Sequence, residues 1–170
     1  MAHILQTERL IVREITELDA PFILELLTDP SFLNGIGDRG VSDLASAVNY
    51  IRTGPGDSYA RNGYGLWLVQ LKDSQLPVGT CGLIRRDTLP AADIGYAFLP
   101  RYWGRGYAVE ACEAVRDHAL RTLEMPELLA IVSPANDASI KVLERIGLRF
   151  REMVQLGADA EQLKLYSVEA

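Results

Sequence analysis

The sequence predicts a mixed α/β domain, in which a twisted, mostly antiparallel sheet of about seven strands is flanked by about four helices. Short strand-like segments follow one another through brief turns in the middle of the chain. A glycine turn then leads into an amphipathic helix, and a wholly apolar strand follows that helix. The 170 residues, with 48% hydrophobic and 24% charged side chains, suit a single folded domain, 1–170, of ordinary globular composition.

The N-terminal segments predict a strand and then a helix. The stretch ERLIVREI, residues 8–15, is typical of a first strand with a partly covered outer face. A helix follows, because Asp19 is a suitable N-cap that places Pro21 in the first turn, where a missing amide hydrogen costs little. The sequence TDP ends this helix at Pro30.

A second, short helix is expected between two polar loops. Ser42 caps it, and apolar residues recur at helical spacing through SDLASAVNYI, residues 42–51. The segments around it, 31–43 and 54–64, are richer in Gly, Asn, Asp and Ser. We expect them to form mobile loops, which is where acceptor-binding elements tend to lie.

The middle of the chain predicts an antiparallel meander. Three strand-like segments, at 65–71, 77–86 and 92–99, are joined by the turn-rich sequences KDSQL and DTLPA. Links this short connect antiparallel strands, whereas parallel strands need a crossover of a dozen residues or more.

A strand, helix and strand follow the meander. The helix has an apolar stripe formed by Ala108, Cys112, Val115 and Ala119. The run LLAIV at 128–132 is typical of a strand covered on both faces, so the three elements predict a parallel, right-handed crossover. A last helix from about residue 137 to 146 stops at a C′ glycine, and FREMVQL and LKLYSV then predict a closing hairpin.

Charge and composition exclude several classes of function. The chain carries 17 basic and 23 acidic residues, a net charge of −6, with no basic stripe, so we expect no nucleic-acid partner. The start MAHILQTERL lacks the apolar run of a signal peptide and no window suits a membrane helix, so we expect a cytoplasmic protein with no membrane partner. Cys81 and Cys112 are expected to be buried free thiols, with a disulfide as the lesser alternative, and His3 and His118 form no metal site with them.

The stretch LPRYWGRGYAVEACEAV, 99–115, places Gly104 and Gly106 between a strand and a helix. Such a turn directs several backbone amides at one spot beside the positive end of the helix dipole, which suits a phosphate or pyrophosphate. The alternative is a tight turn that merely needs positive φ. A P-loop is excluded because no G-x-x-x-x-G-K-[ST] is present, and Val109 stands where a dinucleotide-type turn needs its third glycine.

With SPANDASIKVLERIGLRF added, these features resemble the GNAT superfamily of acyl-CoA-dependent N-acyltransferases, and within it the branch of ribosomal-protein N-terminal acetyltransferases. The resemblance extends from TERLIVREI through ADIGYAFLPRYWGRGYAVEA to PANDASIKVLERIGLRF. The phosphate loop of this superfamily, [Q/R]-x-x-G-x-[G/A], matches WGRGYA with Trp103 at the Gln or Arg position, although a frame starting at Arg101 also fits. The resemblance implies that the pyrophosphate of acetyl-CoA binds to the backbone amides of Gly104, Arg105, Gly106, Tyr107 and Ala108.

The resemblance also implies where the pantetheine arm lies. The strand before the glycine turn should splay from the strand at 128–132, so that Ala97, Phe98 and Leu99 offer backbone groups to the amide-rich arm. Asn136 matches an asparagine that often lies beside this arm, and an Asn before a helix is also a good N-cap.

Ser139 is the first predicted catalytic residue. It shares a helical face with Leu143 and Ile146, so its hydroxyl points inward and needs a partner, for which a bond to a carbonyl one turn earlier is the structural alternative. The resemblance places this serine near the CoA sulfur, while Leu143 occupies the position of the tyrosine proton donor found in many members. We therefore expect Ser139, or water held by it, to protonate the leaving thiolate.

Asp93 is the second predicted catalytic residue. The resemblance matches it to a strand position where a carboxylate can act as general base, and the alternative is a solvated carboxylate at a strand end. Its ordinary pKa of about 3.9 makes it a weak base unless burial raises the value. An N-terminal amine costs about 1 kcal/mol to deprotonate at pH 7 and a lysine-like amine about 4.6 kcal/mol, so a weak base suffices for the first.

The predicted activity is direct transfer of an acetyl group from acetyl-CoA to a primary amine in a ternary complex, without a metal. The expected acceptor is a protein or peptide N-terminus, and a small amine such as a polyamine, an amino acid or an antibiotic is the alternative. The alternative to an enzyme is a non-catalytic module that binds acyl-CoA. Either protein could be a homodimer. Tyr59 and Tyr64 are candidates for an acceptor pocket, whereas Trp67 is expected in the strand core.

Overall fold

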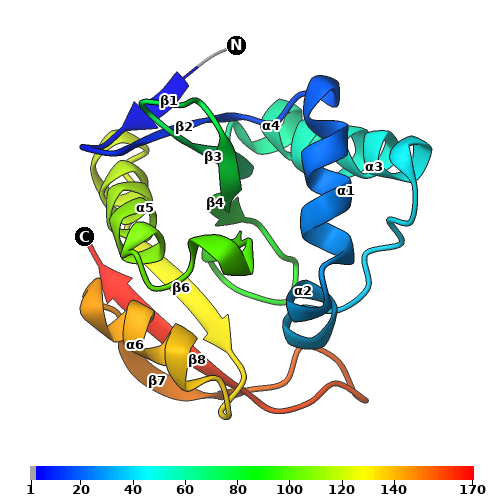
Figure 1. The fold of residues 1–170 in the computed structure, drawn as a ribbon. Coiled ribbons are helices and arrows are strands. Elements are labelled where there is room, and N and C mark those ends of the chain that lie inside the picture. The colour runs from blue at the N-terminus through cyan, green and yellow to red at the C-terminus, as the bar shows by residue number, and fades with distance from the viewer. Residues whose placement is uncertain (1–2) are drawn as a thin grey trace.

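The computed structural model describes residues 3–170, which form one eight-stranded sheet with helices packed on it (Figure 1). The strand order is β1-β2-β3-β4-β5-β6-β8-β7. The strands are β1 (His3–Gln6), β2 (Leu10–Glu14), β3 (Leu66–Leu71), β4 (Pro77–Ile84), β5 (Asp93–Phe98), β6 (Glu127–Val132), β7 (Arg149–Val154) and β8 (Leu163–Glu169).

The helices divide between two hydrophobic clusters. They are α1 (Ala20–Thr28), α2 (Pro30–Gly35), α3 (Leu44–Ile51), α4 (Asp57–Asn62), α5 (Tyr107–Asp117) and α6 (Asp137–Arg145). On β3, Trp67 and Val69 join the cluster that contains α5 and α6, whereas Leu68 joins the cluster that contains α1 and α3. Because successive side chains of a strand point to opposite faces, the two helix groups cover opposite faces of the sheet. No helix among residues 3–170 combines the length and apolarity needed to cross a membrane.

The predicted fold class is confirmed, and so are the meander and the crossover. Strands β2, β3, β4 and β5 pair antiparallel in chain order, and β5 then pairs parallel with β6 through α5. The closing hairpin of β7 and β8 pairs β6 through β8. The predicted count of seven strands is one too low, because β1 is a short edge strand of four residues. Strand β2 is buried on both faces from Leu10 to Arg13, although the sequence predicted a partly covered outer face.

The first helix ends before Pro30 as predicted, since α1 stops at Thr28, but Pro30 also opens a second helix, α2. There its missing amide hydrogen is harmless, and Asp29 caps the turn by accepting from the Ser31 amide at 2.9 Å. The N-cap of α3 is Asp43 and not Ser42, since its carboxylate accepts from the Ser46 amide at 2.8 Å. Asp19 occupies the N-cap position of α1 as predicted, but its carboxylate makes no recorded capping hydrogen bond to that helix.

The segments predicted as loops contain additional helices. Residues 30–35 form α2, and Arg52–Gly56 form a π-helical turn that runs directly into α4. Gly54, Pro55 and Gly56 suggested a break, but a π turn accommodates a proline without its amide hydrogen. The last helix ends as predicted, with Gly147 in the left-handed region at φ +93°.

Candidate active site

The sheet opens between β5 and β6. The two strands share one bridged pair, Asp93 with Leu129, and the Leu129 amide donates to the Ala92 carbonyl at 3.0 Å. Beyond this pair, β5 continues to residue 98 with ladder partners recorded only on β4. The predicted splay is therefore confirmed, and it leaves one edge of β5 without a neighbouring strand within the described chain.

The glycine turn lies where β5 leads into α5. Gly104 has φ +74° and Gly106, the N-cap of α5, has φ +82°, a region that residues with a Cβ rarely adopt. Within residues 3–170, no hydrogen bond is recorded for the amides of Gly104, Arg105 or Gly106. The first amides of α5 have no intrahelical acceptor either. The turn therefore needs positive φ and also presents free amide hydrogens at a helix N-terminus, an arrangement that binds anions.

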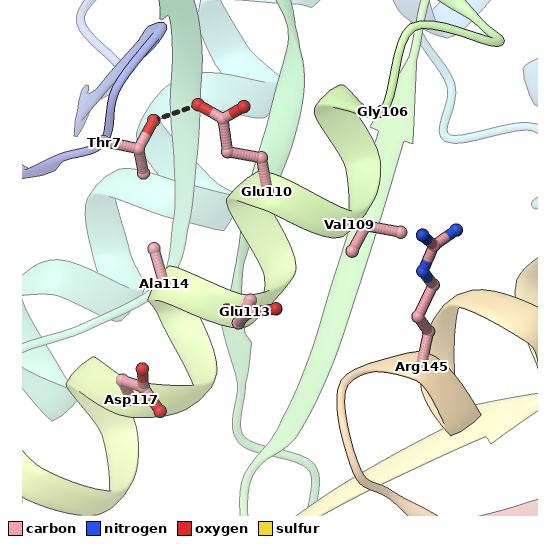
Figure 2. Close-up of a pocket in the computed structure, with 8 residues that line it drawn as sticks. All are labelled: Thr7, Gly106, Val109, Glu110, Glu113, Ala114, Asp117 and Arg145. Atoms are coloured by element: carbon pink, nitrogen blue, oxygen red, sulfur yellow. Dashed lines mark hydrogen bonds between the residues drawn. The ribbon is translucent and has the colours of Figure 1, made fainter.

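Residues from the N-terminal hairpin hold this turn in place, and we call Thr7 and Arg9 the N-terminal brace. The Arg9 guanidinium donates to Glu110 Oε1 at 2.7 Å and to the Arg105 carbonyl at 2.9 Å, and it lies over the Tyr107 ring at 4.5 Å. Thr7 donates its hydroxyl to Glu110, as Figure 2 shows. Burial raises the pKa of Glu110, but the bonds from Thr7 and Arg9 outweigh it and keep the pKa below its usual value. The brace thus fixes the end of the turn that leads into α5.

A cavity of about 460 Å³ lies beside the turn (Figure 2). Its walls come from the turn between β1 and β2, from α5 and from the end of α6, and the lining residues are Thr7, Gly106, Val109, Glu110, Glu113, Ala114, Asp117 and Arg145. In Figure 2 the Arg145 guanidinium points toward Val109 and the glycine turn. No ion pair is recorded for Arg145 among the described residues, so this cation stands close to the free amides without a carboxylate partner.

Some backbone groups predicted to meet pantetheine already have partners. The Trp103 indole donates to the Phe98 carbonyl at 2.8 Å, and the Leu99 amide donates to the Val78 carbonyl at 3.0 Å. A carbonyl has two lone pairs, so Phe98 retains one acceptor site. Ala97 lies on the part of β5 that has no recorded bond to β6. Trp103, at the position of the superfamily's Gln or Arg, therefore tethers the start of the turn to the end of β5.

Ser139 points inward as predicted, and its partner is a tyrosine. The Tyr96 hydroxyl of β5 donates to Ser139 Oγ at 2.9 Å, whereas the alternative bond to a carbonyl one turn earlier is not recorded in the described chain. Asn136 is the N-cap of α6 and accepts from the Ser139 amide at 3.1 Å, which confirms its predicted capping role. Leu143, at the position of the usual tyrosine donor, is buried.

Asp93 is buried at the closed end of the splay. Its side chain is 2% exposed and accepts from Arg86 Nε at 3.0 Å, so it is not a solvated carboxylate at a strand end. Burial raises its pKa to about 6, against the opposing attraction of Arg86. Asp93 lies three residues before Tyr96, so the two side chains point to opposite faces of β5. The structure therefore does not bring the two predicted catalytic residues, Asp93 and Ser139, into contact.

Three site residues were absent from the sequence-based predictions. Tyr96 alternates with Ile94 and Phe98, a pattern that indicates strand core and gives no sign of a polar partner 43 residues away. Arg9 contacts the glycine turn and Arg145 lines the cavity beside it, from opposite ends of the chain, and such approaches have no local signature. For Arg145 the detectable signal was its place in the last turn of the predicted final helix.

Other side chains have structural roles. Cys81 and Cys112 are buried free thiols, as predicted, with Sγ atoms 3.7 Å apart. Trp67 is in the core, also as predicted. Tyr59 does not serve as an open pocket wall, because its hydroxyl accepts from the Ile15 amide at 3.0 Å and donates to the Leu66 carbonyl.

Comparisons with known proteins agree with this geometry. A family model described as an acetyltransferase (GNAT) domain matches residues 9–149. The chain is 27% identical over 150 residues to the uncharacterized N-acetyltransferase YoaA of Bacillus subtilis, covering 88% of this chain and 84% of that protein. A solved acetyltransferase from Agrobacterium tumefaciens superposes with a TM-score of 0.83 at 30% identity, covering 100% of this chain and 95% of the other. The ribosomal L7/L12 α-N-protein acetyltransferase RimL, solved with coenzyme A, has a TM-score of 0.82 at 17% identity over 99% and 98% of the two chains, which shows a shared fold.

Proposed function

Because the chain belongs to the GNAT acetyltransferase family, we propose that it transfers an acetyl group from acetyl-CoA to the α-amine of a protein or peptide N-terminus. The observation that carries the proposal is the splay of β5 from β6 beside a turn of free amides at the start of α5. The open strand edge, the anion site and the buried carboxylate all belong to one continuous segment of the chain, from Asp93 to Ala108.

The residues fit acetyl-CoA as the acyl-donor substrate. The amides of Gly104, Arg105, Gly106, Tyr107 and Ala108 would hold the pyrophosphate, and Arg145 adds a positive charge nearby. The open edge of β5 offers the peptide groups of Ala97, Phe98 and Leu99 to the pantetheine arm in the manner of an added strand. The RimL structure, which holds coenzyme A, has the same fold.

Asp93 and Ser139 take opposite parts in the chemistry. Asp93, directly or through water, accepts a proton from the ammonium, which frees the nitrogen lone pair to attack the thioester carbon. As the carbon–sulfur bond breaks, its electron pair stays on sulfur, and Ser139 gives its hydroxyl proton to that sulfur. The nitrogen loses its second proton as the amide forms, and water relays that proton back to Ser139. Their positions on opposite faces of β5 suit an amine and a thiolate on opposite sides of the thioester.

The properties of Asp93 favour an α-amine as acceptor. With a pKa of about 6 it is a stronger base than an ordinary aspartate, yet Arg86 remains hydrogen-bonded to it. The pKa of an N-terminal amine is roughly 2 above that value, and the pKa of a lysine-like amine is roughly 4.4 above it. Proton transfer from the second amine to Asp93 is therefore more uphill by about 3 kcal/mol. Polyamines and other strongly basic small amines are the poorer match.

Release of free thiol from acetyl-CoA tests the proposal. The purified protein is assayed against peptides with free N-termini, the same peptides with blocked N-termini and an internal lysine, polyamines, amino acids and aminoglycosides. We expect turnover with the free N-termini and none with the blocked peptides. Turnover confined to the small amines would replace the peptide acceptor by a small molecule. If no amine in the panel gave release of free thiol although CoA binding was saturable, the proposed activity would be contradicted.

A further inference from the structure

We propose that Tyr96 is a positioning residue for the reaction: its hydroxyl holds Ser139 in the one orientation in which the serine proton faces the thioester sulfur. The inference rests on the proposed role of Ser139 as proton donor. It is carried by the 2.9 Å hydrogen bond from the Tyr96 hydroxyl on β5 to Ser139 Oγ on α6.

The direction of this bond decides where the serine proton can go. A serine hydroxyl has one proton and two lone pairs, and it rotates to suit its partners. When Tyr96 donates to the serine oxygen, the serine proton cannot also point at Tyr96. Among the described residues, no second protein group is recorded as an acceptor for the Ser139 hydroxyl. The proton therefore remains available to a ligand atom beside Ser139.

Burial keeps Tyr96 in the donating state. The ring packs against the hydrophobic cluster of α5 and α6, where it contacts neither lysine nor arginine in the recorded interactions of the described chain. Burial raises the pKa of Tyr96 to about 12. The phenol thus stays protonated throughout the pH range of an acetyl-transfer assay.

The position of Tyr96 also fits the loss of the helix tyrosine. Leu143 fills that place on α6 and has no proton to offer. Tyr96 approaches Ser139 from the neighbouring strand, on the edge of the splay where the acyl donor would lie. A phenol on β5 and a hydroxyl on α6 together supply a fixed donor that neither Leu143 nor a freely rotating serine provides.

Four proteins test the inference: the wild type, Tyr96→Phe, Ser139→Ala and the double variant. We expect Tyr96→Phe to lower kcat about three- to tenfold, the loss expected for one oriented hydrogen bond, with KM for acetyl-CoA unchanged. The double variant should be no slower than Ser139→Ala, because Tyr96 acts only through the serine. Tyr166→Phe, which removes a buried tyrosine hydroxyl from β8, is the matched control and should retain full activity.

A binding measurement makes the test independent of the amine. The pKa of the thiol of bound CoA is followed by ultraviolet absorbance of the thiolate in the same proteins. Loss of a donor to sulfur should raise this pKa by about 0.5 to 1 in Ser139→Ala and equally in Tyr96→Phe.

The outcomes separate the two proposals. A normal kcat and thiol pKa in Tyr96→Phe, with both altered in Ser139→Ala, would overturn the role of Tyr96 alone, as would additive losses in the double variant. No change in Ser139→Ala would overturn the role of the serine and the inference with it. Matching changes in both single variants support the inference even if the acceptor proves to be a small amine.

Discussion

Arg9 and Glu110 lie 101 residues apart in the chain, and their side chains meet at 2.7 Å across the first turn of α5. Through this contact the hairpin of β1 and β2 determines the shape of the proposed pyrophosphate site. Arg9 also donates a hydrogen bond to the carbonyl oxygen of Arg105. Without this bond, the carbonyl would compete with an anion for the space beside the turn. The strength of anion binding should therefore depend on residues that do not themselves touch the anion.

Glu110→Gln should weaken binding of acetyl-CoA and lower stability. The substitution removes the charge that Arg9 and Thr7 contact, so we expect a loss of about 1 kcal/mol in the free energy of unfolding and a several-fold rise in KM for acetyl-CoA. Thermal melts and steady-state kinetics measure both. Glu113→Gln is the control, since Glu113 lines the same cavity but makes no recorded contact with the brace. Equal effects of the two substitutions would contradict the role of the brace.

Gly106→Ala should be more damaging than Gly104→Ala. Both glycines have positive φ, so an alanine costs about 1 kcal/mol at either position. A Cβ on Gly106 would also lie 3.3 Å from Arg9 Nη2, whereas a Cβ on Gly104 meets nothing within 4 Å. The Arg9 guanidinium must then shift by a few tenths of an ångström, which disturbs its contact with the turn. We expect titration calorimetry to show weaker CoA binding in Gly106→Ala, and the reverse order would show that the brace does not matter for affinity.

Asp93→Asn should distinguish between acceptors. An asparagine cannot take a proton, so substrates that rely on the base lose the most. We expect the rate to fall about tenfold for a peptide α-amine and about a hundredfold for a lysine ε-amine or a polyamine. The ratio of kcat/KM values for matched peptides measures this. Equal losses on both kinds of amine would remove Asp93 as the base.

Asp93 should also make stability depend on pH in an unusual direction. Its folded pKa of about 6 lies above the ordinary value of 3.8, so between these pH values the folded state binds more protons than the unfolded chain. The free energy of unfolding should therefore fall as pH rises from 4 to 6, by up to about 3 kcal/mol from this group. Relative to the wild type, Asp93→Asn should gain stability over this range.

Urea denaturation at pH 4, 5, 6 and 7 measures this dependence. Asp73→Asn, in the exposed turn between β3 and β4, is the control and should run parallel to the wild type. A difference between Asp93→Asn and the wild type that stays constant with pH would show that the pKa of Asp93 is the same in the folded and unfolded states.

Local patterns predicted most of this fold, and the failures have physical causes. The alternation of apolar residues in the strands and the positive φ of the glycines at 104, 106 and 147 depend on local sequence, so both could be predicted. The helices at 30–35 and 57–62 were missed because proline and glycine permit either a break or a helix start, and packing decides between them.

The sequence predicted those parts of the candidate site that depend on a single helix, strand or turn, and missed those that join distant segments. The turn amides, the cap by Asn136 and the inward position of Ser139 follow from spacing along one element. The partners of these groups come from distant segments: Tyr96 for Ser139, Arg9 for the turn and Arg86 for Asp93. For Asp93 the burial that raises its pKa depends on tertiary packing, which no single-sequence pattern encodes.

The single bridge between β5 and β6 has a consequence for how the chain folds. Strands β3, β4 and β5 are joined by short links and pair in chain order, so this part of the sheet can assemble from contacts between sequence neighbours, which form quickly, whereas β2 meets β3 only across the helices of residues 20–62. The half-sheet of β6, β8 and β7 has its own ladders and joins the first by one residue pair and by the packing of α5 and α6. A substrate that fills the opening between β5 and β6 would add contacts between the two half-sheets, so both the free energy of unfolding and its cooperativity should increase when the substrate is bound.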